Sequence, residues 1–250
     1  MTRIIISGCN GKMGREIAAR VKTRTDCRVV AGIDIFTESD GLFPVYAKPD
    51  EIMEEADVLI DFSNPALLSP LLAYSLSKKL PSVLCTTGYS KEQVEELKKA
   101  SLQIPVFYSR NMSLGINLLI ELSKKAAAVL GGQFDIEIIE KHHNQKLDAP
   151  SGTALMIADA ISEEMNRDMR YVYDRHSQRK KRDDNEIGIH SIRGGTIVGE
   201  HEVIFAGSHE VLSLSHSAQS KEVFANGAIN AAVYLKDQPA GLYDMSDLLK

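Results

Sequence analysis

The chain has 250 residues, of which 44% are hydrophobic, and a formal net charge of -5. This length and composition predict a globular protein with one large domain or two modest ones. The acidic balance argues against a nucleic-acid partner, so an anionic ligand has to be recognised by local groups. Because no segment has the length and hydrophobicity of a signal peptide or a membrane span, we expect no membrane partner and a cytoplasmic location. Neither a disulfide framework nor a zinc site fits the three widely spaced cysteines, Cys9, Cys27 and Cys85.

Short β-rich segments alternate with helical patterns between Arg3 and Tyr108. The β-rich segments lie at 4–7, 28–33, 58–62, 83–85 and 106–108. Helix starts are marked between them, because Asn64 and the following proline form a cap, and Ser90 with Gln93 forms a capping box. This alternation predicts an α/β domain with a parallel sheet.

A glycine-rich turn follows the first β-rich segment directly and opens a helical pattern. This is the context of a dinucleotide-binding fingerprint, but the glycines stand at the first, fourth and seventh places of the turn. We predict that Gly8 makes the tight turn and Gly14 the close contact of helix and strand, while backbone N–H groups meet a pyrophosphate. A turn that binds no ligand is the alternative. The predicted contact residues are Gly8, Cys9, Asn10, Gly11, Lys12 and Met13.

An acidic residue, Asp34, ends the second β-rich segment, twenty residues after Gly14. A carboxylate at this place accepts hydrogen bonds from the adenosine ribose of a nicotinamide dinucleotide. Its charge repels a 2′-phosphate, and the two residues after it offer no guanidinium to receive one, so we expect NADH to be preferred over NADPH. Lys12 and Arg15 in the first turn of the helix leave the use of NADPH open.

Two further segments lie at the carboxyl ends of predicted strands, where open α/β sheets bind ligands. We expect both to line the nicotinamide and its ribose, with ordinary turn chemistry as the alternative. Asp61 ends the third strand in a similar position. The residues concerned are Cys85, Thr86 and Thr87 in one segment and Ser109, Arg110, Asn111 and Met112 in the other.

The pattern changes after Ser113. Helices are predicted over 115–130 and up to about 166, and long strand-like runs follow at 187–193, 199–206 and 211–217. They predict an α+β region with an open, mostly antiparallel sheet whose exposed face can pair with other subunits of a homo-oligomer. We interpret the charge-dense run 175–186 as a solvated, mobile loop. A last helix over 221–235 and a partly apolar tail at 242–249 both need a surface to pack against.

Two imidazoles, an ammonium group and a carboxylate lie between the strand-like run that starts near Glu137 and the next helix. Adjacent side chains of a strand point to opposite faces, so His142 and His143 would not chelate one metal ion, and we predict no metal site. Proton transfer fits better, because histidine titrates near neutral pH and the pKa of a lysine near other cations can approach it. His142 and Lys146 are therefore the predicted catalytic residues. Asp148 either orients Lys146 or caps the turn.

The following helix starts with a proline and three small residues, Ser151, Gly152 and Thr153. A helix start provides free N–H donors, the two hydroxyls add polar groups, and glycine lets a ligand approach closely. We predict that these residues bind a carboxylate of the substrate. A plain serine cap is the alternative, but an anionic substrate explains the cations and the helix start together.

Residues 137–154 resemble the signature of the dihydrodipicolinate reductases, Glu-[Ile/Val]-X-Glu-X-His-X-X-X-Lys-X-Asp-X-Pro-Ser-Gly-Thr-Ala, and match it at every position. The similarity extends along the chain at 8–14, 61–63, 86–88, 111–113, 191–195, 199–201 and 224–228. It implies a Rossmann-like dinucleotide-binding domain at 1–113, to which 221–250 returns, and a substrate and oligomerisation domain at 114–220. Such enzymes are usually tetramers, so a homotetramer is expected.

The reaction that the resemblance implies is the reduction of a cyclic, unsaturated imine dicarboxylate of the lysine (diaminopimelate) pathway, with hydride from C4 of NADH or NADPH. By motif position, His142 and Lys146 donate protons, and His143, Gly152 and Thr153 bind a substrate carboxylate. Some relatives differ from this chain at Cys85, Met112 and Asn230, where they carry a glycine, an aromatic residue and an arginine.

Two other functions are weighed against this one. Another NAD-dependent dehydrogenase of similar layout, acting on an acyl group, would need a nucleophilic cysteine in the second domain, but all three cysteines precede residue 86. A dinucleotide-sensing regulator would need a DNA-binding segment or a basic face, which the sequence lacks. It would also leave His142 and Lys146 without a role.

Overall fold

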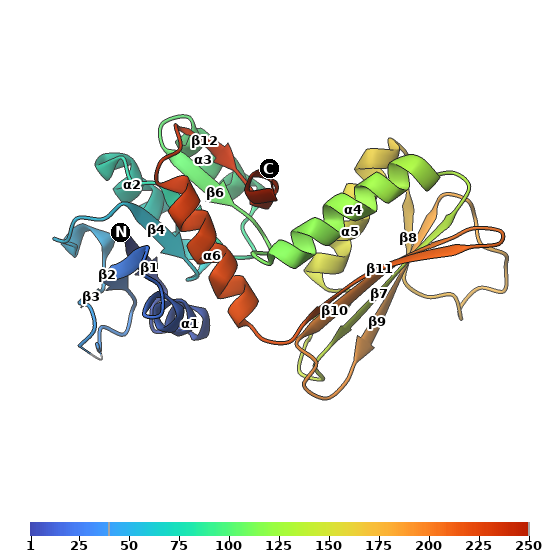
Figure 1. Ribbon diagram of the computed structural model, residues 1–250, viewed down its shortest axis with the longest axis horizontal. Helices are drawn as coiled ribbons and strands as arrows, with labels where there is room; N and C mark the ends of the chain where they lie inside the picture. The colour runs from blue at the N-terminus through green and yellow to red at the C-terminus, as the bar shows by residue number, and fades with distance from the viewer. Residues whose placement is uncertain (40, 250) are drawn as a thin grey trace. The chain divides into compact units, whose positions relative to one another are not determined.

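The computed structural model describes residues 1–39 and 41–249 and divides the chain into two units (Figure 1). The first unit comprises Met1–Leu114 and Glu222–Lys250, and the second comprises Gly115–Lys221. Within the described residues, no helix is both long enough and apolar enough to cross a membrane.

The first unit contains a seven-stranded sheet in the order β12-β6-β5-β4-β1-β2-β3. Every neighbouring pair in it is parallel, which confirms the predicted α/β class. Its central strands are almost continuously apolar because helices cover both faces. The strands are β1 (Thr2–Ser7), β2 (Cys27–Ile33), β3 (Val45–Tyr46), β4 (Val58–Asp61), β5 (Ser82–Leu84), β6 (Pro105–Tyr108) and β12 (Gly241–Tyr243).

Two groups of helices cover this sheet. On one face, α1 (Lys12–Val21) and α6 (Glu222–Leu235) pack over Ile4 and Ile6. On the other face, α2 (Leu68–Lys78) and α3 (Lys91–Ser101) pack over residues such as Leu59 and Val106. The alternating side chains of each strand thus supply both cores. The predicted capping box is confirmed, since Ser90 Oγ accepts from Gln93 N and Gln93 Oε1 accepts from Ser90 N.

The second unit contains a five-stranded sheet in the order β11-β10-β7-β9-β8. β10 runs antiparallel to β7 and β11, but β9 runs parallel to β7 and β8, so the expectation of a mostly antiparallel sheet is wrong. The reason is connectivity, because α5 (Gly152–Met165) carries the chain back before β8 and β9 begin, and only β10 and β11 form a hairpin. The strands are β7 (Asp135–His142), β8 (Arg170–Val172), β9 (Glu186–Arg193), β10 (Gly199–Ala206) and β11 (Val211–Ala218).

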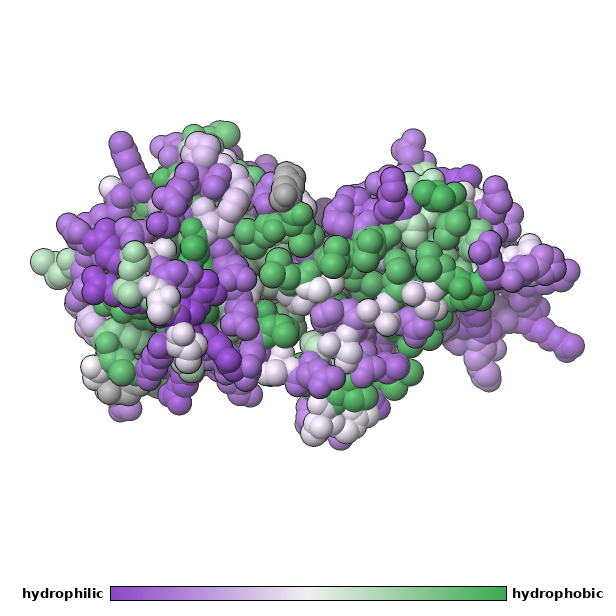
Figure 2. All heavy atoms as spheres, in the orientation of Figure 1, coloured by the Kyte–Doolittle hydropathy of each residue, from purple (hydrophilic) through white to green (hydrophobic). Residues whose placement is uncertain are grey.

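One face of this sheet packs against α4 (Leu114–Leu130) and α5 (Figure 1). The core between them includes Ile138 and Phe205 from the strands and Ile157 from α5, all fully buried. Hydrophobic residues also gather along the outer face of α4 (Figure 2), where Leu118 and Leu122 are exposed.

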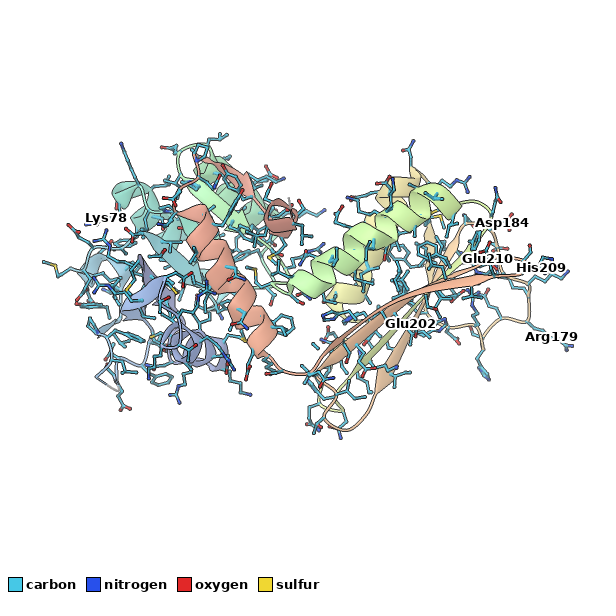
Figure 3. The ribbon with its side chains drawn as sticks, in the orientation of Figure 1. Lys78, Arg179, Asp184, Glu202, His209 and Glu210 are labelled. Carbon is cyan, nitrogen blue, oxygen red and sulfur yellow. The ribbon has the colours of Figure 1, made fainter. Side chains whose placement is uncertain are left out.

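The charge-dense segment between β8 and β9 is anchored to the sheet, so its interpretation as a mobile, solvated loop is wrong in part. Arg175 pairs with Glu137 on β7 and with Glu186 on β9, and Arg182 donates to the carbonyl of Ile136. The outermost residues of the segment are exposed, among them Arg179 and Asp184 (Figure 3). Arginines can hold a loop in this way because one guanidinium reaches several acceptors.

Candidate active site

The glycine-rich turn of the first unit has the geometry expected from its spacing. Gly8 has a φ of 76°, which favours glycine, and a side chain at Gly14 would overlap the carbonyl oxygen of Gly8. The next helix starts at Lys12, and its N-cap residue, Gly11, has no side chain that could accept a hydrogen bond. The first N–H groups of the helix therefore depend on another acceptor. This turn can therefore hold the pyrophosphate of a dinucleotide.

Asp34 lies beside this turn. Its Oδ2 accepts a hydrogen bond from the backbone N–H of Asn10 at 2.9 Å, and its Oδ1 accepts one from Phe36 N at 3.1 Å. The side chain of Asn10 donates in turn to the carbonyls of Phe36 and Glu38. These bonds hold the carboxylate next to the turn, where the adenosine ribose of a bound dinucleotide is expected.

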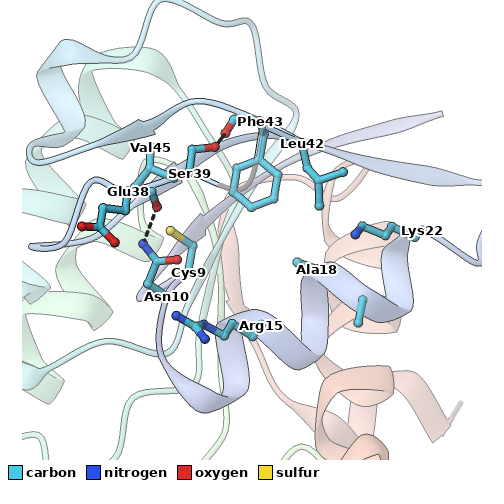
Figure 4. Close-up of a pocket in the computed structure, with 11 residues that line it drawn as sticks. Cys9, Asn10, Arg15, Ala18, Lys22, Glu38, Ser39, Leu42, Phe43 and Val45 are labelled. Atoms are coloured by element: carbon cyan, nitrogen blue, oxygen red, sulfur yellow. Dashed lines mark hydrogen bonds between the residues drawn. The ribbon is translucent and has the colours of Figure 1, made fainter.

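A cavity of about 520 Å³ opens next to Asn10 (Figure 4). Leu42 and Phe43 form an apolar wall on one side, and Arg15 on α1 and Lys22 at the C-terminal end of that helix lie on the other. The volume and the mixture of apolar and cationic groups suit an adenosine moiety that carries anionic groups. Lys12 does not line this cavity, whereas Arg15 from α1 and Lys22, the residue after this helix, do.

The end of β4 holds a buried carboxylate, Asp61, that organises the neighbouring turn. It accepts hydrogen bonds from Ser63 Oγ at 2.5 Å, Thr86 Oγ1 at 2.6 Å and Tyr89 OH at 3.1 Å. The hydroxyl of Thr86 is therefore used inside the protein, whereas Thr87 is exposed.

Two of the predicted cofactor contacts have buried side chains. Cys85 lies in the core of the first unit, and burial raises the pKa of its thiol well above the ordinary value. Met112 is also in that core, and its carbonyl oxygen packs so closely against Gly227 that a side chain at position 227 would overlap it. Both residues therefore offer very little exposed surface to a ligand in this conformation.

The remaining predicted contacts lie after β6. Ser109 donates to the carbonyl of Asn111 at 2.8 Å, and Asn111 Oδ1 accepts from Ser113 N at 2.9 Å, so these two residues shape the turn. Arg110 is exposed. Asn230, on α6, accepts a hydrogen bond from Arg24 at 2.7 Å.

The polar cluster of the second unit is built around a buried carboxylate. Glu140 has no exposed surface, and its Oε2 lies 2.5 Å from Nδ1 of His142. Arg193 binds both carboxylate oxygens at 2.7 and 2.8 Å, and the backbone N–H of Ser151 donates to Oε1 at 3.1 Å. Burial alone would raise the pKa of Glu140, but the hydrogen bonds from His142 and Arg193 hold it well below the ordinary value. Glu140 is therefore ionised.

The other predicted groups lie around the end of β7. His142 is buried and His143 is only partly buried, and Nδ1 of His143 has no partner among the described residues. Lys146 pairs with Asp148 at 2.8 Å, and this pairing lowers the pKa of Asp148. This contact supports the prediction that Asp148 orients Lys146, and not the alternative that it caps the turn.

At the start of α5, the side chain of Ser151 is occupied by contacts within the protein, whereas the space around Gly152 is free. Ser151 Oγ accepts from Ala154 N and lies 3.1 Å from Nε2 of His201, so this hydroxyl is engaged and buried. A Cβ on Gly152 would contact nothing within 4 Å. A ligand can therefore approach the helix start at Gly152 but not at the Ser151 hydroxyl.

Three residues of this cluster were not predicted: Glu140, Arg193 and His201. The signal for Glu140 was present, because it alternates with Ile136 and Ile138 and so faces the core, where a charge needs partners. His201 lies opposite it on β10. Burial lowers the pKa of His201 to about 3, so this imidazole is neutral, and its ring meets that of His142 edge to face.

Comparison with known proteins assigns both parts of the chain. The family models described as dihydrodipicolinate reductase, N-terminus and C-terminus, match residues 2–112 and 115–249. A 4-hydroxy-tetrahydrodipicolinate reductase from Caldanaerobacter subterraneus is 55% identical over 250 residues, which cover 100% of this chain and 99% of the relative. One from Clostridium novyi is 50% identical, with the same coverage.

Solved structures agree with this assignment. A dihydrodipicolinate reductase from Paenisporosarcina sp. TG-14, solved with dipicolinate bound, superposes with a TM-score of 0.81 at 25% identity and covers 98% of this chain and 97% of that one. A scyllo-inositol dehydrogenase from Lactobacillus casei, solved with NAD(H) and scyllo-inositol, has a TM-score of 0.62 at 12% identity over 99% of this chain and 92% of that one. The second likeness concerns the fold alone.

Proposed function

The chain belongs to the dihydrodipicolinate reductase family, and from this membership we propose that it reduces 4-hydroxy-tetrahydrodipicolinate to tetrahydrodipicolinate in lysine biosynthesis. In this reaction the substrate gains one hydride and one proton, and its 4-hydroxyl group leaves as water. The observation that carries the proposal is the polar cluster at the end of β7, where His142, Lys146 and the open helix start at Gly152 lie in one short stretch of chain. A cyclic imine dicarboxylate needs both features, proton donors and a carboxylate site.

The hydride source is a pyridine nucleotide, and we assign its binding to the first unit. Support comes from Gly8 and Gly14, which leave room for a pyrophosphate, and from the cavity that Phe43 and Arg15 line. When bound, the nucleotide supplies a hydride from C4 of its ring. NADH is the preferred form in this proposal, because the Asp34 carboxylate repels a 2′-phosphate, while Arg15 and Lys22 in the cavity allow some use of NADPH.

The substrate is bound by the second unit in this proposal. Gly152 and Thr153 at the start of α5 receive one carboxylate, and His143 and Lys146 add positive or hydrogen-bonding groups. Ser151 has a supporting role, because its hydroxyl caps the helix and contacts His201.

The chemistry of the second unit is acid catalysis. Hydride addition raises the electron density at the ring nitrogen and the adjacent carbon, and a nearby cation and proton donor lower the barrier to that step. His142 and Lys146 are the proton donors in this proposal, and Lys146 is also the nearby cation.

We also propose that the enzyme is a cytoplasmic homotetramer. The face of the second sheet opposite α4 and α5 carries Ile139, Ile192 and Ile204 among charged side chains, which suits contact between subunits. The three cysteines are unpaired and buried, which fits a reducing compartment. Because these cysteines are buried, no exposed thiol is present for the acyl chemistry of the alternative NAD-dependent dehydrogenase. Light scattering of the purified protein measures the subunit number.

One coupled assay tests the function. Purified protein is added to a dihydrodipicolinate synthase reaction, and the consumption of NADH and of NADPH is followed in separate samples. We expect both cofactors to be oxidised, NADH with the higher kcat/KM. If neither is oxidised, the proposed activity is wrong, and if NADPH is preferred, only the role of Asp34 is wrong.

A further inference from the structure

We propose that Glu140 is a positioning residue, which fixes the proton-bearing atom of His142 and ties it to the substrate-binding start of α5. This role rests on the reductase function proposed above and adds a residue to it. Glu140 is completely buried at a core-facing position of β7, yet it is ionised. A buried carboxylate needs a full set of donors.

The hydrogen bond between Glu140 and His142 defines the tautomer of His142. An ionised carboxylate only accepts hydrogen bonds, so Nδ1 of His142, 2.5 Å from Oε2, has to carry a hydrogen. The second ring nitrogen, Nε2, forms no hydrogen bond with the described part of the chain. It faces Gly199, where a Cβ would lie 3.1 Å away. Proton donation by His142 is thereby directed to Nε2, the ring nitrogen that Glu140 does not engage.

The charges around His142 come from several elements. Glu140 from β7 is the one anion in hydrogen-bond contact with the ring, and Arg193 from β9 shares that anion. His201 from β10 faces the ring but stays neutral because it is buried, and Lys146 adds a cation that is balanced by Asp148. His216 on β11 lies opposite His201 and is also desolvated, which lowers its pKa. Glu140 is thus the group that stabilises a charged, proton-donating His142.

The same carboxylate also holds the substrate site in place. Its Oε1 accepts from the backbone of Ser151, the cap of α5, and Arg193 reaches from Glu140 to the carbonyl of Asp148 at 2.6 Å. Asp148 in turn pairs with Lys146. One buried anion therefore sets the relative positions of both proton donors and the anion-binding helix start, a precision that catalysis needs.

The first test measures the imidazole itself. In wild-type protein labelled with ¹⁵N-histidine, we expect neutral His142 to be the tautomer with hydrogen on Nδ1, with the resonance assigned by its loss in His142→Ala. Neutral His142 with hydrogen on Nε2 would overturn the proposal. This measurement needs no substrate and no folded variant of Glu140, so it is independent of whether the reductase function is correct.

The second test uses Glu140→Gln, an isosteric change that replaces one acceptor oxygen by an NH₂ donor. We expect kcat to fall at least 10-fold, with a smaller change in the KM for the dicarboxylate, and the basic limb of the kcat profile to move to lower pH, because the anion beside the imidazole is lost. In a His142→Ala background the same change should lower kcat by a smaller factor than in wild type, because a large part of its effect passes through His142. Fully additive losses, or an unchanged pH profile, would count against the role.

Glu137→Gln is a matched control on the same strand. Glu137 also pairs with a histidine, His190 at 2.8 Å, and with Arg175 and Arg182, but on the opposite face of the sheet. We expect it to lower the melting temperature while leaving kcat and its pH profile close to wild type. If Glu137→Gln shifts the pH profile as much as Glu140→Gln does, the effect is general and the proposal fails.

Discussion

Arg175 donates from Nη1 to the buried carboxylate of Glu186 across 2.8 Å, and so ties the segment before β9 to that strand. The hydrogen bond from Arg175, helped by Arg170, lowers the pKa of Glu186 to about 2. A carboxyl group whose pKa is lower in the folded state than in the unfolded state contributes stability above the unfolded value, near 4.3 for glutamate. That stability is lost as the pH falls from about 4 toward 2.

Replacement of Glu186 by glutamine should therefore destabilise the protein near neutral pH but not in acid. We expect the melting temperature of Glu186→Gln to be roughly 2–8 °C lower than that of wild type at pH 7. The difference should shrink as the pH falls below about 4, because the carboxyl group is then protonated in the unfolded chain, and it should vanish near pH 2, where the folded protein is protonated as well. Thermal denaturation followed by circular dichroism at pH 7 and pH 3 measures both values. An equal difference at the two pH values would contradict this account.

Removal of either proton donor should reduce turnover. We expect Lys146→Ala and His142→Ala each to lower kcat by about 100-fold or more, the usual scale of general acid catalysis. Steady-state kinetics with the coupled assay measures this. His190→Ala is a suitable control, because His190 also contacts a glutamate but lies on the other face of the sheet. Near-wild-type kcat in Lys146→Ala or His142→Ala would refute that residue's role.

The two glycines of the cofactor turn should differ in their tolerance of a methyl group. A Cβ at Gly14 would overlap backbone atoms of Gly8 and Cys9, whereas one at Gly11 would lie 3.2 Å from the Gly8 carbonyl oxygen. Such overlap costs about 1–3 kcal/mol and distorts the turn. We expect Gly14→Ala to raise the Kd for NADH by 10-fold or more in a fluorescence titration, and Gly11→Ala to raise it less. The reverse order would exclude the close approach at Gly14.

A bulky side chain at the open helix start should weaken substrate binding. Gly152→Val places methyl groups where the carboxylate is expected, and the loss of one charged hydrogen bond, about 1.5 kcal/mol, corresponds to roughly a tenfold higher KM. Gly194→Val is the control, because Gly194 also has open space around it. We expect the KM for the dicarboxylate to rise in Gly152→Val alone, with stability unchanged in both. A normal KM in Gly152→Val would show that the substrate binds elsewhere.

Much of the fold was accessible from local patterns. The run Ile4-Ile5-Ile6 predicts a strand buried on both faces, and the serine at position 90 predicts the helix start that is found. The strands β3, β8 and β12 were missed because two or three residues are too few for a periodic pattern. The equally short β5 was predicted from its run of apolar residues and its place between two marked helices. The direction of β9 was also missed, since it depends on the path of the chain between β7 and β9.

The site was predictable where its residues lie close together in the sequence. His142, Lys146 and Gly152 stand within one stretch, and the spacing of Gly8 and Gly14 defines a turn. The partners of Glu140 were beyond local patterns, because Arg193 is 53 residues away and is brought near by the pairing of β7 with β9. The burial of Cys85 and Met112 likewise results from the packing of α6.

The sheet of the first unit receives its last strand, β12, and one of its covering helices, α6, from the end of the chain. The whole second unit, which has a core of its own, is encoded between these parts. During synthesis on a ribosome, the second unit can therefore fold before the first is complete. Until residues 222–243 emerge, the apolar surface around Ile4 and Ile60 lacks α6, and the nascent chain is open to chaperones at that surface.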